Sequence, residues 1–267
     1  LCNFVDPDDD NDGWSDADEG LCEVRNSWSS FNTGSSSNPQ YTVPYYLRPI
    51  DLEFDESGLR MFGHDYNWQH PRLWSYTDPA TLGNNQNHHA IISSSSSSYR
   101  SSGELEIHDG YAYTSHNLRV YKTPATATSF SSSTQFMSFS GGSSYASDMA
   151  ISSNGTVYVN DHSTIQWKDQ NGNSGSIQYP SNAYTRYAQI DIDANDNLHF
   201  MAYSSTLGGL YYWVHDVTDW SSSPTYIWSG STNTMEPSAS EMTVDSSGTV
   251  HAVFIYNTEV VYRYGNG

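Results

Sequence analysis

A short pattern recurs five times between residues 50 and 257, and it limits the fold more than any other feature of the chain. Each copy is an alternating apolar and polar stretch, a turn of the D/N/S-x-G type, and a second β-prone stretch. Glycine or asparagine at such a turn suits a hairpin residue with positive φ. The turns centre on Gly58, Gly110, Gly155, Asn197 and Gly248, at successive spacings of 52, 45, 42 and 51 residues. The five copies are IDLEFDESGLRMFGHD (50–65), ELEIHDGYAYTSHN (104–117), DMAISSNGTVYVNDH (148–162), IDIDANDNLHFMAYS (190–204) and EMTVDSSGTVHAVFIYN (241–257).

Two more β-prone stretches follow most of these hairpins. Third strands are predicted at residues 72–77, 118–123, 164–169 and 210–216, and fourth strands at 88–94, 134–140, 175–181 and 224–230. The fifth unit ends at 259–267 without a fourth strand. The segment RNSWSSFNT (25–33) is similar to TDWSSSPTYIW (218–228), which occupies the fourth-strand position of unit four, so it can supply the missing strand.

Four-strand units of about 45 residues that need a terminal strand to close are the signature of a β-propeller. We therefore predict an all-β fold, a five-bladed propeller whose last blade is closed by an amino-terminal strand; the alternative is a β-sandwich pair. Closure removes the open sheet edge that otherwise recruits other chains. The D-x-x-G hairpins loosely resemble the Asp-boxes of sialidase-like and lectin propellers.

An acidic loop near the amino end has the spacing of a calcium ligand set. Residues 8–19 read DDDNDGWSDADE, which matches the twelve-residue D-x-D-x-D-G-x5-E pattern. A hard cation takes about six to eight oxygens, and Gly13 permits the sharp turn. The predicted Ca²⁺ ligands are Asp8, Asp10, Asp12, the carbonyl of Trp14, Asp16 and Glu19.

The surrounding sequence DPDDDNDGWSDADEGLC (6–22) resembles a thrombospondin type 3 repeat, an extracellular calcium module. Cys2 and Cys22 bracket the loop; we expect a disulfide, and two free thiols are the alternative. Together these features predict an extracellular protein with a calcium-binding domain at 1–24 and a propeller at 25–267. The chain starts at Leu1 and has no signal peptide, so we expect it to be processed or part of a longer protein.

The charge of the chain excludes several partners. Asp and Glu total 30 against 10 Lys and Arg, a formal net charge of −20. Such a field repels nucleic acid and anionic membrane surfaces, and no apolar stretch is long enough for membrane insertion.

Alignment of the first strands places one polar residue of each unit in an equivalent position near the axis. A cation or sugar-hydroxyl site is one interpretation; the other is that each acid caps its strand or bonds a neighbouring backbone. The candidates for ligand binding in this ring are Asp51, Glu104, Asp148 and Glu241, with Gln189 in the fourth unit.

Histidines and aromatic residues form the other candidate groups. Second strands end in His64, His116 and His162, with Tyr203 and Tyr256 in the last two units, and we expect hydrogen-bonding roles rather than a metal site. Most aromatic residues are expected in the core between blades, but some can present ring faces to a ligand. Those singled out are Trp68, Trp74, Tyr76, Trp167, Tyr211, Tyr212, Trp213, Trp220 and Trp228, with Trp68 expected to be exposed in a loop. Asn154 lies in the one N-x-S/T glycosylation sequon.

The leading hypothesis is a non-catalytic extracellular recognition module that binds carbohydrate or a protein partner at a cell surface. One alternative is a structural subunit that self-assembles by strand exchange into a filament or sheath. Another is a propeller glycoside hydrolase, for which Asp51, Asp148 and Glu241 are the available carboxylates. No local motif of such a hydrolase is present, so we expect no enzymatic activity.

Overall fold

A computed structural model of the chain describes its β-strands and many of the turns that join them. The described residues are 47–55, 58–65, 71–76, 89–91, 103–116, 118–127, 133–139, 148–160, 164–180, 184–204, 206–216, 219–221, 224–229, 235–256 and 259–266. All of them lie in one of the two compact units of the chain, Tyr46–Ala80 with Gln86–Gly267. The predicted calcium loop, Cys2, Cys22, Trp68, His162 and residues 25–33 lie outside the described residues.

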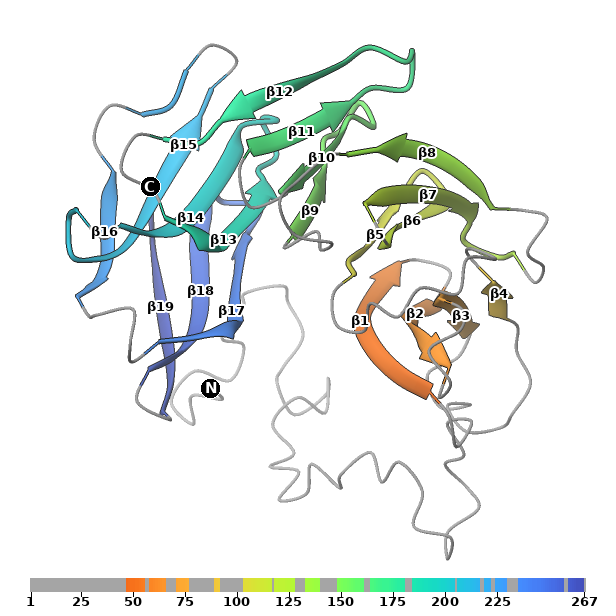
Figure 1. The fold of residues 1–267 in the computed structure, drawn as a ribbon, viewed down its shortest axis with the longest axis horizontal. Coiled ribbons are helices and arrows are strands. Elements are labelled where there is room, and N and C mark those ends of the chain that lie inside the picture. The colour runs from red at the N-terminus through yellow and green to blue at the C-terminus, as the bar shows by residue number, and fades with distance from the viewer. Residues whose placement is uncertain are drawn as a thin grey trace, which may run out of the picture. The chain divides into compact units, whose positions relative to one another are not determined.

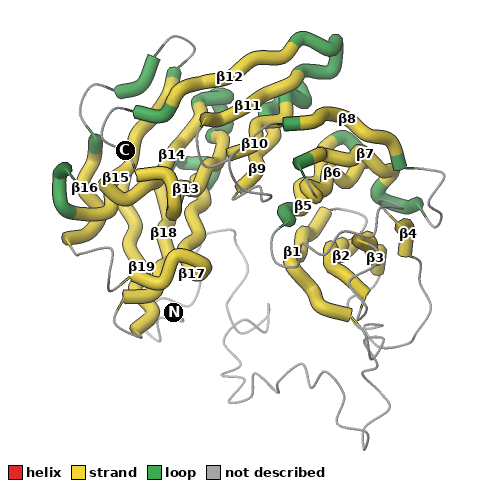
Figure 2. Tube along the Cα trace, in the orientation of Figure 1, coloured by secondary structure: helices red, strands yellow, loops and turns green. Residues whose placement is uncertain are grey.

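The described residues form strands and loops, with no helix among them, as Figure 2 shows. Within this part of the chain, no helix has the length and apolar character to span a membrane. The strands make four four-stranded sheets and one three-stranded sheet, each with its strands in chain order (Figure 1).

The strand bounds follow the predicted units closely. Sheet one holds β1 (Leu47–Asp55), β2 (Gly58–Asp65), β3 (Pro71–Tyr76) and β4 (His89–Ile91); sheet two holds β5 (Leu105–His108), β6 (Tyr111–His116), β7 (Arg119–Pro124) and β8 (Thr134–Ser138). Sheet three holds β9 (Asp148–Ile151), β10 (Val157–Asn160), β11 (Thr164–Lys168) and β12 (Ser174–Gln178); sheet four holds β13 (Tyr184–Ile192), β14 (Leu198–Ser204), β15 (Gly209–His215) and β16 (Thr225–Ser229). Sheet five holds β17 (Met235–Val244), β18 (Thr249–Tyr256) and β19 (Glu259–Asn266).

The hairpin turns between first and second strands explain why the repeats fold alike. Gly110, Gly155 and Gly248 have φ of 73°, 80° and 81°, a backbone conformation that glycine adopts without strain. In sheet four the residue with positive φ is Asp196, at 63°, and not the predicted Asn197. Asn197 instead donates its backbone N–H to the Asp193 carboxylate, and this hydrogen bond closes the turn.

Successive sheets pack face to face through four apolar clusters. In each cluster, one sheet contributes what we call its forward face, and the sheet that follows in the chain covers it. Sheets four and five meet through Met201, Tyr203, Leu210 and Tyr212 on one side and Met242, Val250, Ala252 and Phe254 on the other. Three similar clusters join sheets one and two, two and three, and three and four.

The first strands of consecutive sheets are also neighbours, since β1 contacts β5, β5 contacts β9, β9 contacts β13, and β13 contacts β17. Sheets that pack in series with their first strands together form a β-propeller arrangement, so the all-β propeller prediction is confirmed and the β-sandwich alternative is wrong. Four blades are complete among the described residues. The fifth sheet has three described strands, and the predicted fourth falls outside the described part of the chain.

Candidate functional site

The carboxylates of the first strands act mainly as links between blades. Asp51 of β1 accepts a hydrogen bond from the backbone N–H of Leu105 at 2.8 Å, and Leu105 begins β5 in the next sheet. Asp148 of β9 accepts the N–H of Ile190 in β13 at 2.6 Å. These bonds satisfy backbone donors at the sheet junctions, where an unpaired buried N–H costs about 1–3 kcal/mol. For Asp51 and Asp148, the interpretation that the acid bonds a neighbouring blade's backbone is therefore confirmed.

A third link was missed by the sequence alignment. Asp191 accepts the N–H of Val244 at 2.7 Å and the hydroxyl hydrogen of Thr243 at 3.0 Å, which joins β13 to β17. The alignment singled out Gln189, which is buried two residues earlier on the same face of β13. Side chains at i and i+2 point the same way from a strand, and so the alternation alone could not choose between them.

Mutual repulsion accompanies this gathering of carboxylates. Burial, reinforced by the charges of Asp51 and Glu241, holds the pKa of Glu104 well above its usual range. Burial also raises the pKa of Asp148, with the Glu104 charge adding to it, although the N–H groups of Ile190 and Met149 offset part of the increase.

Glu241 and Glu106 share this environment. The Glu241 side chain retains solvent exposure, yet the protein atoms around it and the nearby Asp51 charge raise its pKa to about 7. Burial and the Glu53 charge raise the pKa of Glu106. Within the described residues, no three acidic, histidine or cysteine side chains are placed to hold a metal ion together. The geometry thus gives a proton-sensitive group of acids at the first strands, three of which accept hydrogen bonds from backbone N–H groups of the next blade.

Of the histidines and tyrosines at the ends of the second strands, the structure describes the side chains of His116 and Tyr203. His116 is buried at the end of β6, and Tyr203 belongs to the apolar cluster between sheets four and five. No metal site forms from them among the described residues. The prediction of hydrogen-bonding roles remains a prediction for His64, whose side chain is not described.

A recurring Asp–His–Tyr arrangement was not anticipated. In sheet four, His199 lies with Nε2 3.2 Å from Asp193 and with Nδ1 against the Tyr212 hydroxyl. In sheet five, His251 Nε2 lies 3.1 Å from Asp245, and its Nδ1 lies 2.6 Å from the Tyr262 hydroxyl. A signal was present, because the spacing D-x5-H occurs in both units. The arrangement ties the hairpin turn to the second and third strands.

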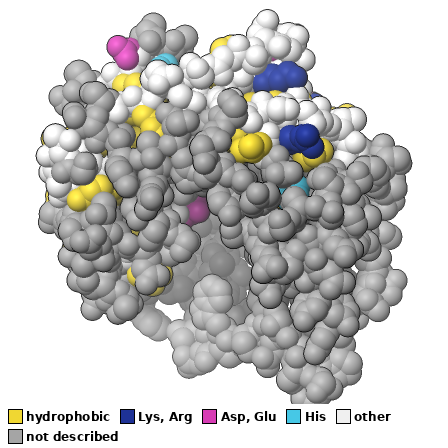
Figure 3. All heavy atoms as spheres, viewed as in Figure 1, with side chains coloured by type: hydrophobic (Ala, Val, Ile, Leu, Met, Phe, Trp, Pro, Cys, Tyr) yellow, Lys and Arg dark blue, Asp and Glu magenta, His cyan; other side chains and the backbone are white. Residues whose placement is uncertain are grey.

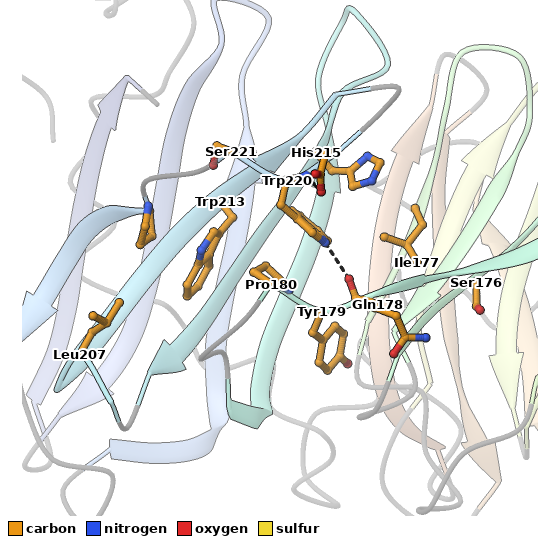
Figure 4. A pocket seen from close by; sticks show the side chains of 12 residues that line it. Ser176, Ile177, Gln178, Tyr179, Pro180, Leu207, Trp213, His215, Trp220 and Ser221 are labelled. Carbon is orange, nitrogen blue, oxygen red and sulfur yellow. Dashed lines mark hydrogen bonds between the residues drawn. The ribbon is translucent and has the colours of Figure 1, made fainter.

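An aromatic pocket lies between the outer strands of sheets three and four. We call it the inter-sheet pocket; its volume is about 720 Å³, and it is lined by Ser176, Ile177, Gln178, Tyr179, Pro180, Leu207, Trp213, His215, Asp219, Trp220, Ser221 and Pro224. Figure 4 shows Trp220 and Tyr179 facing this space beside Pro180. The end of β12 and the two residues after it supply one wall, and β15 with the segments on either side of it supplies the other.

Contacts across the two sheets fix the aromatic rings of this pocket. The Trp220 indole N–H donates to the Gln178 carbonyl oxygen at 2.7 Å, so a sheet-four side chain is tied to a sheet-three strand (Figure 4). The His215 ring stands edge-on to Trp220 at 5.0 Å between centroids, and Phe200 packs against Trp220 from the core. The described part of this pocket therefore combines fixed ring faces with the exposed polar groups Gln178 and Asp219.

The aromatic residues predicted as ligand contacts divide between core and pocket. Tyr212 and Trp213 are almost fully buried, which agrees with a core between blades, and Trp220 is half-buried with a face toward the pocket. In the view of Figure 3, described hydrophobic side chains are scattered rather than gathered in one broad patch. Asn154 is exposed on the turn between β9 and β10, where its side-chain oxygen accepts the Thr156 N–H. Its glycosylation stays a prediction.

Comparisons with known proteins support the fold and go no further. No family model matches the chain, and no curated protein matches it. Among solved structures, a catalytically inactive virginiamycin B lyase from Staphylococcus aureus with Quinupristin is similar at a TM-score of 0.54 and 9% identity, over 84% of this chain and 72% of that chain. A streptogramin B lyase is similar at 0.53 and 12% identity, over 85% and 70% of the two chains. A Penicillium chrysogenum alpha-L-arabinanase complexed with arabinobiose is similar at 0.51 and 13% identity, over 85% and 80%.

Proposed function

We propose that this chain is a non-catalytic extracellular recognition module that binds an uncharged carbohydrate in the inter-sheet pocket. The observation that carries the proposal is the pocket itself. Its volume of about 720 Å³ is bounded by Tyr179, Trp213 and Trp220, with Gln178, His215 and Asp219 among its polar lining. Ligand sites in proteins are typically concave, aromatic-lined and equipped with a few polar groups that fix orientation.

The chemistry of the lining favours a sugar over a purely apolar ligand. The faces of a sugar ring that carry C–H groups pack on aromatic rings, while its hydroxyls need both donors and acceptors nearby. The exposed Gln178 side chain can donate and accept, and the Asp219 carboxylate can accept. One oxygen of Asp219 already accepts the backbone N–H of Trp220 at 2.8 Å, and its second oxygen can accept a ligand hydroxyl.

The charge of the chain selects among sugars. At a net charge of −20, a sulfated or carboxylated glycan meets long-range repulsion, and the described residues that line the inter-sheet pocket include no Lys or Arg. A neutral hexose or pentose carries no such penalty, and its hydroxyls match the lining.

Substitution of Trp220 tests the proposal. On a glycan array followed by calorimetry, Trp220→Ala should weaken the best neutral ligand at least about tenfold, because a ring face is lost. Trp220→Phe, which keeps a ring but lacks the indole N–H, should retain most of the affinity. Tyr226→Ala is the matched control, since Tyr226 is an exposed aromatic residue outside this pocket. If no glycan binds the wild-type chain with calcium present, the proposal is wrong.

The amino-terminal part of the proposal concerns calcium and closure. We propose that Asp8, Asp10, Asp12, Trp14, Asp16 and Glu19 bind one Ca²⁺, that Cys2 and Cys22 close this loop, and that an amino-terminal strand completes a fifth blade. The support is the ligand spacing in the sequence together with a fifth sheet that has three strands among the described residues. Calorimetry should detect calcium uptake that Asp12→Asn with Glu19→Gln abolishes; uptake unaffected by these changes contradicts the assignment.

A second candidate function is glycoside hydrolysis at the first strands. The observation that favours it is the raised pKa of Asp148 and of Glu241, because a hydrolase needs one carboxyl that stays protonated near neutral pH beside one that is ionised. Against it, Asp148 uses both oxygens to accept backbone N–H groups. Arabino-oligosaccharides are suitable probes, and hydrolysis that disappears in Glu241→Gln but not in Trp220→Ala would favour this candidate.

A further inference from the structure

A second pocket lies between sheets two and three, one junction before the inter-sheet pocket. Its volume is about 630 Å³, and we call it the Lys168 pocket. Met137 and Ser138 of β8 line it on one side, and residues of β11 and β12 line it on the other. In both pockets, therefore, the fourth strand of one sheet meets the third strand of the next.

The strand register shows that Lys168 and His215 are equivalent residues of the two pockets. Lys168 pairs with Val157, which packs in the apolar cluster between sheets two and three. His215 pairs with Leu198, which packs in the cluster between sheets three and four. Residues directly opposite each other on paired strands have side chains on the same face. Lys168 thus faces the preceding sheet as His215 does.

Polar side chains continue along this face of sheet three. Thr164 and Gln166 precede Lys168 at intervals of two residues on β11, and Ser174 and Ser176 of β12 pair with Lys168 and Gln166. Side chains two residues apart on a strand point the same way, so all five lie on the face toward sheet two. All five line the pocket, and both serines are exposed. This wall therefore offers hydroxyl, amide and ammonium groups together.

The charge of the Lys168 pocket is opposite to that of the inter-sheet pocket. Lys168 is the one basic residue among the described residues that line it, and none of these is acidic. Its ammonium donates to the Phe136 carbonyl oxygen at 2.7 Å, which fixes its position. An ammonium has three N–H donors and this bond uses one, so the others can meet an anionic ligand.

The acidic neighbour of Lys168 is engaged elsewhere. One oxygen of Asp169 accepts the backbone N–H groups of Asn171 and Asn173 at 2.9 and 2.8 Å, and the other accepts the Asn173 side-chain amide at 2.7 Å. Both oxygens thus close the turn between β11 and β12. The net charge of −20 opposes an anion at a distance, but salt screens exposed charges beyond about 8 Å at physiological ionic strength. Contact with Lys168 then decides which ligand is held.

We propose that the Lys168 pocket is a second ligand site and that it binds a carboxylated sugar. The carboxylate pairs with the Lys168 ammonium, and the sugar hydroxyls meet Gln166, Ser174 and Ser176. This inference goes beyond the neutral-sugar proposal, and it does not depend on a ligand in the inter-sheet pocket.

Charge reversal at an exposed position tests the site without disturbing the core. Paired uronic acid and neutral glycans are screened on an array with the full chain, and the best uronic acid glycan is titrated by calorimetry. Ser174→Glu places a carboxylate directly across from Lys168 and should weaken this glycan at least about tenfold, since a hydrogen bond to a charged group is lost. Ser174→Gln has a similar size and no charge, and should stay within about threefold of wild type.

Removal of the ammonium gives the second test. Lys168→Met should weaken the uronic acid glycan at least about tenfold. Lys122→Met is the matched control, because it makes the same change in net charge at a lysine that does not line the pocket. The proposal is overturned if no uronic acid glycan binds the wild-type chain, or if binding survives both Ser174→Glu and Lys168→Met. Binding of that glycan that is lost in Trp220→Ala and kept in Lys168→Met would also overturn it, because the ligand would then belong to the inter-sheet pocket.

Discussion

The first strands and the inter-sheet pocket use polar side chains in opposite ways. On the first strands, Asp51, Asp148 and Asp191 each direct one carboxylate oxygen at a backbone N–H group of the next blade. In the pocket, Gln178 and Asp219 are exposed beside ring faces that other contacts already hold in place. The comparison indicates that carboxylates near the centre maintain the blade order, whereas groups free to meet a ligand lie between the outer strands.

The difference also explains why a group of acids on inner strands is weak evidence of a binding site. A propeller must join sheets whose first strands lie side by side without pairing, so their backbone donors need acceptors from side chains. A carboxylate can accept from two donors at once, as Asp148 does with Met149 and Ile190. Repulsion between neighbouring acids is then the cost of that solution.

Asp148→Ala should give the largest loss of stability. It leaves the N–H groups of Met149 and Ile190 without acceptors at a buried junction, so we expect the free energy of unfolding to fall by about 2–4 kcal/mol. Asp148→Asn keeps one acceptor oxygen and should lose about half as much. Urea unfolding measures both, and equal stability of Asp148→Ala and wild type would contradict the assigned role. Carbohydrate binding by the folded fraction should not change.

The sequence predicted the repeating units well, because hairpin turns and strand alternation are local properties. Gly110, Gly155 and Gly248 mark turns whose shape depends on the backbone conformation of only a few residues. In sheet four the predicted turn position was wrong by one residue, because Asp196 and not Asn197 has the left-handed conformation. Either residue type tolerates positive φ, so composition could not distinguish them.

The candidate site was predictable only in part. The position of Asp51 and Asp148 on the first strands followed from alignment, and bonding to a neighbouring backbone was one of the two expected outcomes. The link through Asp191 depends on which of two side chains on one face reaches β17, a matter of how blades pack. The inter-sheet pocket joins segments about 40 residues apart, and the sequence named Trp213 and Trp220 without showing that only Trp220 turns a face outward.

Acid should stabilise the first-strand region. The pKa of Glu241 is about 7 in the fold against an ordinary value near 4.5, so the folded state binds the proton more tightly than the unfolded state. Stability from this group is therefore highest below about pH 4.5 and falls as pH rises to about 7. Asp148 and Glu104, whose pKa values are also raised, act in the same direction.

Glu241→Gln isolates that contribution. The neutral side chain should raise the Tm at pH 8 by about 2–4 °C, the equivalent of about 1 kcal/mol after allowance for the water around Glu241, and should change it little at pH 4.5. Scanning calorimetry between pH 4.5 and 8 gives the profile. A wild-type Tm that increases steadily over this range would show that repulsion among the acids is not felt.

Gln178→Ala should have the smallest effect on stability and a clear effect on binding. The Gln178 side chain is exposed, and only its backbone carbonyl accepts the Trp220 indole N–H, which alanine retains. Removal of the amide should leave the free energy of unfolding within about 0.5 kcal/mol of wild type. It should also weaken a neutral glycan by about threefold to tenfold, since one hydrogen bond to the ligand is lost. Calorimetry on both variants decides the comparison: if Gln178→Ala destabilises the fold as Asp148→Ala does, the pocket is part of the scaffold and its polar groups are not free for a ligand.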